Sequence, residues 1–105
     1  MADPQTLLTA VDRLADRFRS MPQSRLLGPV PGYPSRAAAV RALAARLAGR
    51  PLAAAGERDR PFPDAGAFAA GDQLAVAGRE LAAVADAPTL AEAATGVRSV
   101  DELTA

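Results

Sequence analysis

The chain has 105 residues, enough for one domain, and half of them are hydrophobic, but Ala supplies 27 of those 52 residues. Leu, Val and Phe together make only 22 residues and Ile is absent, which is just above the share of about 20% below which chains tend to stay disordered. We therefore expect a small domain with a thin core. The composition excludes more functions than it specifies.

Three residue types that carry much of enzyme chemistry, Cys, His and Lys, do not occur. Without Cys there is no disulfide and no thiolate, and without His the usual general base and the commonest transition-metal ligand are missing. Without Lys there is no Schiff base and no Walker lysine. We therefore expect no cofactor and no metal. All 12 basic residues are Arg, which together with abundant Ala, Gly and Pro is typical of a GC-rich bacterial genome.

The net charge is zero, but it is divided unevenly along the chain. Residues 1–50 carry eight Arg and three acidic residues, whereas the remainder carries four Arg and nine acidic residues. The halves therefore have charges of +5 and −5. No apolar run approaches the roughly 18 residues of a membrane helix, and the first residues lack the basic and apolar regions of a signal peptide. We expect a cytoplasmic protein.

The first predicted helix begins at Pro4 and ends near Ser20 or Met21. Its apolar residues recur at helical spacing: Leu7, Val11, Leu14 and Phe18. Asp3 is a suitable N-cap, and Pro4 in the first turn loses only an amide that has no partner there. Pro22 disfavours helical angles at the residue before it.

Residues 22–34 are rich in Pro and Gly, which predicts a stiff loop rather than a regular element. The large apolar residues of this loop are expected to pack back on the helices: Leu26, Leu27, Val30 and Tyr33. A second helix is predicted from Arg36 to Ala48, with Ser35 as N-cap and a stop at Gly49 and Pro51. We interpret residues 50–66 as a mobile linker, with Phe62 as its anchor on the core.

The third predicted helix runs from Ala67 or Asp72 to Asp86. One side of it is apolar or small: Leu74, Ala77, Gly78, Leu81, Val84 and Ala85. Gly78 lowers helix propensity by up to about 1 kcal/mol, so we expect a neighbouring backbone to approach it closely. Val76 lies on the opposite side, between two lines of charged and polar residues.

The C-terminal region contains two capping-box patterns. Thr89-x-x-Glu92 predicts the start of a short fourth helix, and Ser99-x-x-Glu102 predicts the start of a final turn. Gly96 lies between them, and no segment alternates as a strand does. The predicted architecture is a small all-α bundle of three main helices plus a short C-terminal helix, mostly antiparallel.

Asp12 and Asp16 are the candidate pair for catalysis by carboxylates alone, because residues four apart are neighbours on the surface of a helix. Arg residues interleave with the pair, and a hard cation needs about six or more oxygen ligands that nothing nearby supplies. The Ser residues have no His or Lys to activate them. We therefore predict a protein that is not an enzyme.

Binding is the predicted function, and a protein partner is favoured. We interpret the chain as an adaptor, accessory subunit or regulator, with self-association as a dimer expected. The candidate contacts lie in the Pro-rich loop and on the outer face of the third helix: Leu26, Leu27, Tyr33, Val76, Arg79 and Glu80.

Nucleic-acid binding by the basic half is the alternative. Its candidate phosphate contacts are on the second helix: Arg36, Arg41, Arg46 and Arg50. At 100° per residue, however, Arg41 points away from Arg46 and Arg50. The overall charge of zero also differs from the basic charge that is usual for such domains.

Overall fold

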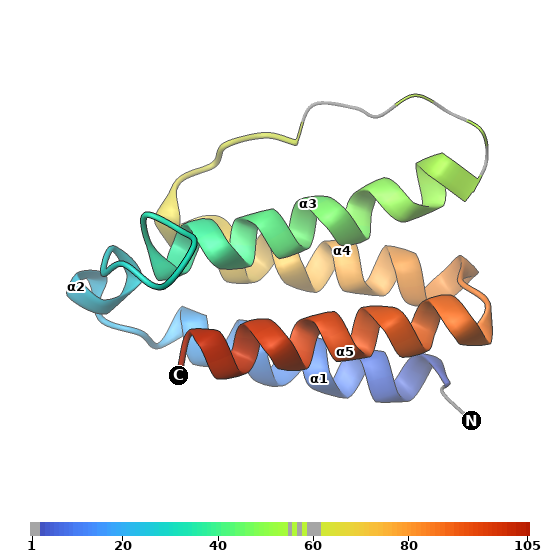
Figure 1. Ribbon diagram of the computed structural model, residues 1–105, viewed down its shortest axis with the longest axis horizontal. Coiled ribbons are helices and arrows are strands. Elements are labelled where there is room, and N and C mark those ends of the chain that lie inside the picture. The colour runs from blue at the N-terminus through green and yellow to red at the C-terminus, as the bar shows by residue number, and fades with distance from the viewer. Residues whose placement is uncertain (1–2, 55, 57, 59–61) are drawn as a thin grey trace.

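The computed structural model describes residues 3–54, 56, 58 and 62–105, and within them it confirms the predicted all-α bundle (Figure 1). The elements in chain order are α1 (Pro4–Arg19), α2 (Gln23–Leu26), α3 (Arg36–Ala54), the single 3-10 turn η1 (Ala67–Ala69), α4 (Ala70–Val84) and α5 (Ala87–Leu103). None of the helices in this described part is long and apolar enough to cross a membrane.

The four long helices form a square in cross-section. α4 packs against α3 and α1, and α5 packs against α1 and more lightly against α3, so α4 and α5 occupy opposite corners. Figure 1 shows α1 and α5 running in one direction and α3 and α4 in the other. Of the four packed pairs, α1 with α4 and α3 with α5 are therefore antiparallel, as predicted, whereas α3 with α4 and α1 with α5 are parallel. Because α3 and α4 are parallel, the chain between them must return along the length of the bundle.

Helix α1 begins and packs as its sequence predicts. The backbone amide of Thr6 donates to the Asp3 carboxylate at 2.9 Å, so Asp3 is the N-cap. The helix buries Leu7, Val11 and Leu14 completely.

Phe62, which was expected to anchor the linker before α4, packs half-buried against the same core, so this expectation is confirmed.

The two glycines of α4 mark where α1 approaches most closely. A Cβ atom at Gly78 would lie 2.8 Å from a methyl group of Val11, and one at Gly71 would lie 3.0 Å from the carbonyl oxygen of Ala15. The close approach expected at Gly78 is therefore present, although the neighbour is a side chain rather than backbone, and a close approach of backbone occurs at Gly71.

The Pro-rich segment contains a regular element that was not expected. Helix α2 begins after Pro22, whose carbonyl oxygen accepts from the amide of Leu26 at 3.0 Å. A proline is tolerated at a helix start because it lacks only a donor that would have no partner. Leu26 and Val30 pack into the core as predicted, but Leu27 is 51% exposed.

Helix α3 continues beyond its predicted stop and ends at Ala54, so that Gly49 and Pro51 lie inside it. Ser35 caps its start as expected, with its hydroxyl accepting from the amide of Ala38 at 3.0 Å. Pro51 removes one backbone donor and strains one turn, but only three helical residues follow it. The predicted linker over residues 50–66 therefore begins later, and part of it lies outside the described residues.

Helix α5 is a single helix of 17 residues, so both predicted capping boxes are wrong. Asp86 is the N-cap instead, because its carboxylate accepts from the amide of Thr89 at 3.0 Å. Ser99 lies inside the helix and donates its hydroxyl to the carbonyl of Thr95. Gly96 also lies inside the helix. Because α3 packs only lightly against α5 there, no neighbour comes so close that this position must be a glycine.

Candidate functional site

Two arginines close the end of the bundle where α5 ends and α3 begins. Arg17 donates from Nη1 to the carbonyl oxygen of Thr104 at 2.9 Å and from Nη2 to the carboxylate of Asp101 at 2.7 Å. Arg36 donates from Nε to the same Thr104 carbonyl at 3.1 Å. Carbonyls at a helix C-terminus carry partial negative charge and have no helical partner, so the guanidinium groups satisfy them. We call Arg17, Arg36, Asp101 and Thr104 the polar junction.

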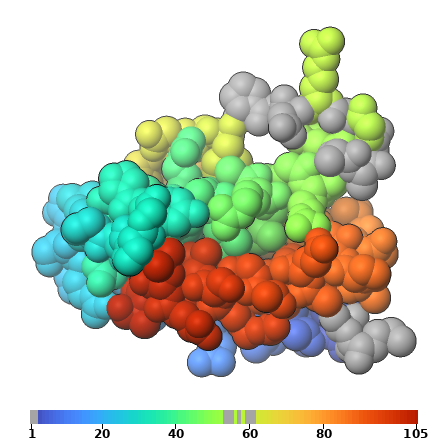
Figure 2. Space-filling model, in the orientation of Figure 1, coloured from blue at the N-terminus to red at the C-terminus, as the bar shows by residue number. Residues whose placement is uncertain are grey.

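Thr104 is the centre of the polar junction. It is fully buried, and its hydroxyl donates to the carbonyl of Val100 at 2.7 Å while accepting from Arg17 at 2.7 Å. In Figure 2 the red C-terminal turn of α5 lies against the teal segment that leads into α3. Arg36 also donates to the carbonyl of Arg25 at 3.3 Å, so this candidate phosphate contact holds the fold together.

Arg41, the second candidate phosphate contact, is also turned toward the protein. Its Nη2 donates to the carbonyl oxygen of Phe62 at 2.8 Å, and its guanidinium lies 5.7 Å from the centre of the Phe62 ring. This combines a hydrogen bond with a cation–π contact. Its Nε is buried and has no partner among the described residues. Arg41 therefore anchors the returning chain on α3.

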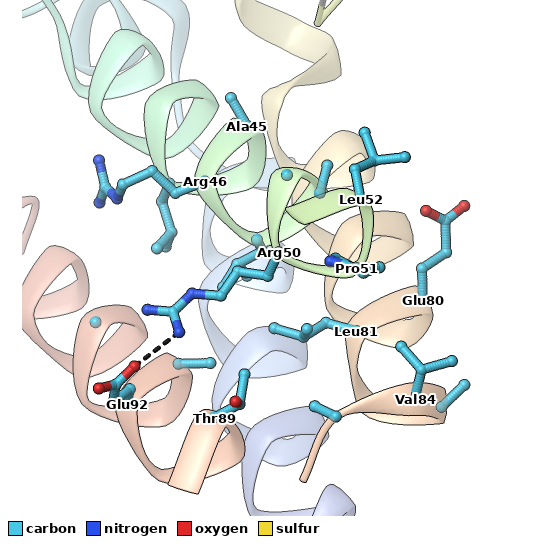
Figure 3. Close-up of a pocket in the computed structure, with 18 of the residues that line it drawn as sticks. Ala45, Arg46, Arg50, Pro51, Leu52, Glu80, Leu81, Val84, Thr89 and Glu92 are labelled. Atoms are coloured by element: carbon cyan, nitrogen blue, oxygen red, sulfur yellow. Dashed lines mark hydrogen bonds and ion pairs between the residues drawn. The ribbon is translucent and has the colours of Figure 1, made fainter. Parts of the chain in front are cut away.

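Arg46 and Arg50 are exposed and border a hollow at the opposite end of the bundle from the polar junction (Figure 3). Arg50 donates to the carboxylate of Glu92 on α5 at 2.7 Å. The structure therefore does not bring the four candidate arginines together. Two bind backbone carbonyls, one is in an ion pair, and only Arg46 has no ion pair or hydrogen bond within the described part of the chain.

The hollow lies between the last turns of α3, the last turns of α4 and the first half of α5. Its large apolar lining residues are Leu43, Leu47, Leu52, Phe62, Leu81 and Val84. Val84 is 69% exposed, although the sequence pattern placed it on the buried side. The reason is local: the hollow opens at this last turn of α4, so none of the described residues covers Val84.

Several carboxylates of the described residues are paired with neighbouring side chains or backbone amides. Asp16 accepts from Arg19 at 2.8 Å, and Asp12 is 3.8 Å from Arg79. Hydrogen bonds from Thr6 lower the pKa of Asp3, and hydrogen bonds from Thr89 lower the pKa of Asp86, as expected for carboxylates at helix N-caps. Among the described residues no three or more acidic groups gather where they could hold a metal ion.

The first group of candidate protein contacts, in the Pro-rich segment, is only partly accessible. Leu26 is 1% exposed and belongs to the core, whereas Leu27 is 51% exposed. Tyr33 is half-buried, and its backbone pairs with Val30 in an isolated antiparallel bridge. Leu27 is therefore the member of this group that offers a large apolar surface.

The second group lies on the outer face of α4 and is accessible throughout. Val76 is 53% exposed, and Arg79 and Glu80 are exposed as well. Arg79 is close only to Asp12 of α1, and Glu80 borders the hollow beside α3. The two groups lie apart: the first is at the end of the bundle near α2, and the second is along the side of α4.

Sequence reasoning missed Phe68, which at 69% exposure is as open as Val84. It lies in η1, just before α4. A Phe after a glycine turn carries no signal of exposure, because its neighbours in sequence do not determine which side of a single turn faces solvent. With Phe68, Val76 and Val84, three of the four exposed large apolar side chains among the described residues lie on η1 and α4.

No protein-family model, no curated protein and no solved structure matches this chain.

Proposed function

We propose that this chain is a non-enzymatic protein-interaction module, an adaptor, accessory subunit or regulator, that binds its partner through the outer face of α4. The observation that carries the proposal is the exposure of Phe68, Val76 and Val84 along η1 and α4. At 100° per residue Val84 is turned about 80° around α4 from Val76, toward the hollow, so these side chains offer successive apolar contacts along one element. Exposed apolar side chains with a polar rim are typical of interaction surfaces. Leu27 gives a second, smaller apolar contact.

Nucleic-acid binding has less support. Phosphate contacts need guanidinium groups that are free to face the nucleic acid, and Arg36 and Arg41 donate to backbone carbonyls instead. Arg50 is neutralised by Glu92. Binding through Arg46 alone would not produce the strong salt dependence of a nucleic-acid-binding domain.

The proposal is tested by affinity purification of the tagged chain from a lysate of its source organism, with and without nuclease. The informative variant is Val76→Glu, which places a charge in the middle of the apolar face without touching the core. The matched control is Ala91→Glu, at an exposed position of α5. We expect proteins that survive nuclease treatment and are retained by the control but lost from Val76→Glu.

Two outcomes would contradict the proposal. Identical capture by the wild type, Val76→Glu and Leu27→Glu would show that neither apolar contact binds a partner. Capture that disappears with nuclease would assign the binding to nucleic acid. Circular dichroism of each variant establishes that the helices are intact, so that a loss of binding is not a loss of fold.

A further inference from the structure

The sequence of the outer face of α4 is symmetric about Val76. Ala83 lies seven residues after Val76, which corresponds to about 10 Å along the helix and a rotation of only about 20°, and Ala69, the last residue of η1, lies seven residues before it. Ala83 is exposed and Ala69 is half-buried. These three residues form an apolar line in which small side chains flank one larger side chain, so a second helix could approach closely.

The charged residues beside this line have opposite signs at equivalent positions. Asp72 lies four residues before Val76 on one side of the line, and Arg79 lies three residues after it on the same side. On the other side Gln73 lies three residues before Val76 and Glu80 four residues after it, so this side carries a single charge. A two-fold axis perpendicular to the helix at Val76 therefore brings Asp72 of one copy to Arg79 of another.

We propose that the partner of this face is a second copy of the chain, bound through an antiparallel pair of α4 helices with Val76 at the two-fold axis. The inference rests on the proposed function, because it identifies the partner of the same surface. An isologous interface of this kind requires a self-complementary surface, and the Asp72 and Arg79 pattern provides it twice. A parallel pair would instead place Asp72 of one copy opposite Gln73 of the other and Arg79 opposite Glu80. Arg79 therefore pairs with Asp72 in the antiparallel pair and with Glu80 in the parallel pair, and the variants described below distinguish the two.

The groups that would pair across the axis are accessible and incompletely used within one chain. The Asp72 side chain is 71% exposed, and one of its oxygens accepts from Arg19 Nε at 2.8 Å. The Arg79 side chain is 63% exposed, and its contact with Asp12 is long, at 3.8 Å. The second oxygen of Asp72 and most donors of Arg79 thus remain for the other copy.

The size of the face sets the expected affinity. One helix of 15 residues covers less than the interface of about 800 Å² per partner that is standard for stable complexes. We therefore expect a weak dimer that dissociates on dilution. Sedimentation between low and high micromolar concentration should show the change from monomer to dimer.

The orientation is tested by cysteine cross-linking, because the wild-type chain contains no Cys. With a short bismaleimide, Val76→Cys should cross-link to itself much faster than the control Ala91→Cys. Ala69→Cys and Ala83→Cys should each cross-link poorly alone but well when mixed, because about 20 Å separates like positions in the antiparallel pair. Self-cross-linking of Ala69→Cys above the control rate would overturn this arrangement.

The charge pattern is tested by reversing one member at a time. Asp72→Arg and Arg79→Asp should each weaken self-association at least tenfold, whereas an equimolar mixture of the two variants should form a heterodimer with restored affinity. Each variant alone also creates like charges with its neighbours on α1, but that local effect cannot produce recovery on mixing. Arg98→Asp on α5 changes the net charge as Arg79→Asp does and should have no effect.

The outcomes separate this inference from the proposed function. If the chain stays monomeric to high micromolar concentration and the mixed charge variants do not associate, the second copy is not the partner. If Val76→Glu nevertheless loses a nuclease-resistant protein in the affinity purification, the face binds a different protein and the proposed function stands. If neither experiment responds to Val76→Glu, both are wrong.

Discussion

The two ends of the bundle are built from the same four helices but are closed in different ways. At one end, two guanidinium groups of the polar junction tie α1 and α3 to the last carbonyls of α5. At the other end, the last turns of α3 and α4 and the first turns of α5 border the hollow, and the ion pair of Arg50 with Glu92 spans it at an exposed position.

This difference shows how a chain with few large apolar residues can still hold one arrangement. The core residues are too small and too few to fill both ends, and hydrogen bonds from charged groups to otherwise unpaired carbonyls are worth more than those between neutral groups. The closed end therefore concentrates the directional interactions. The open end keeps apolar side chains in contact with solvent.

The largest expected difference between the ends concerns two leucines. Leu26 at the closed end is 1% exposed, whereas Leu52 at the open end is only half-buried and lines the hollow. Leu26→Ala should lower the free energy of unfolding by about 2 to 4 kcal/mol, because it leaves a cavity, and Leu52→Ala by less than about 1 kcal/mol. Urea denaturation measures both. Equal losses would contradict the difference between the ends.

The second comparison uses two arginines. Arg17→Met removes the hydrogen bonds to Thr104 and Asp101 while keeping an apolar stem. We expect a loss of about 2 to 3 kcal/mol, because the Thr104 hydroxyl and Asp101 lose their charged donor, whereas the Thr104 carbonyl still accepts from Arg36. Arg46→Met at the open end should change the free energy of unfolding by no more than about 0.5 kcal/mol. Similar values for both variants would show that the polar junction does not stabilise the fold.

The start of α1 and the close approach at Gly78 could be predicted because their signals are local. Asp3 immediately precedes the helix and accepts from the amide of Thr6. The absence of a side chain at Gly78 indicates that a neighbour lies close, but not that this neighbour is the Val11 side chain of α1. Both predictions use only the sequence of a single helix and the general rule that helices pack closely.

The polar junction and the true start of α5 could not be predicted in this way. Arg36 finds its acceptor 68 residues away along the chain, and no spacing rule relates such positions. At the start of α5, Asp86 and Thr89 are both suitable caps, and the sequence alone does not rank them. The candidate site was predictable where it depended on one helix, as at Val76, and not where it depended on the fold, as at Leu26 and Phe68.

A smaller effect is expected for the centre of the polar junction. Thr104→Val keeps the shape of the side chain but removes a hydroxyl that donates to Val100 and accepts from Arg17. Because Arg17 keeps the Thr104 carbonyl and Asp101 as acceptors, we expect a loss of about 1 to 2 kcal/mol. Thr104→Ser, which keeps the hydroxyl, is the control. A Thr104→Val variant as stable as the wild type, or no more unstable than Thr104→Ser, would show that the hydroxyl does not stabilise the junction.

The smallest expected effect is a pH dependence confined to the open end, where α1 and α5 both begin. Hydrogen bonds at the N-caps lower the pKa of Asp3 and of Asp86 below the ordinary value of 3.8. A carboxylate whose pKa is lowered by folding stabilises the folded state above its ordinary pKa, and this contribution is lost as the pH falls through the lowered value. Below about pH 4, the amides of Thr6 and Thr89 should therefore lose protection from hydrogen exchange before the amide of Thr104 does.

Asp86→Asn keeps an acceptor that does not titrate, so the Thr89 amide in this variant should keep its protection through the same range. A loss at Thr89 that is unchanged by Asp86→Asn would place the acid-sensitive group elsewhere in the bundle.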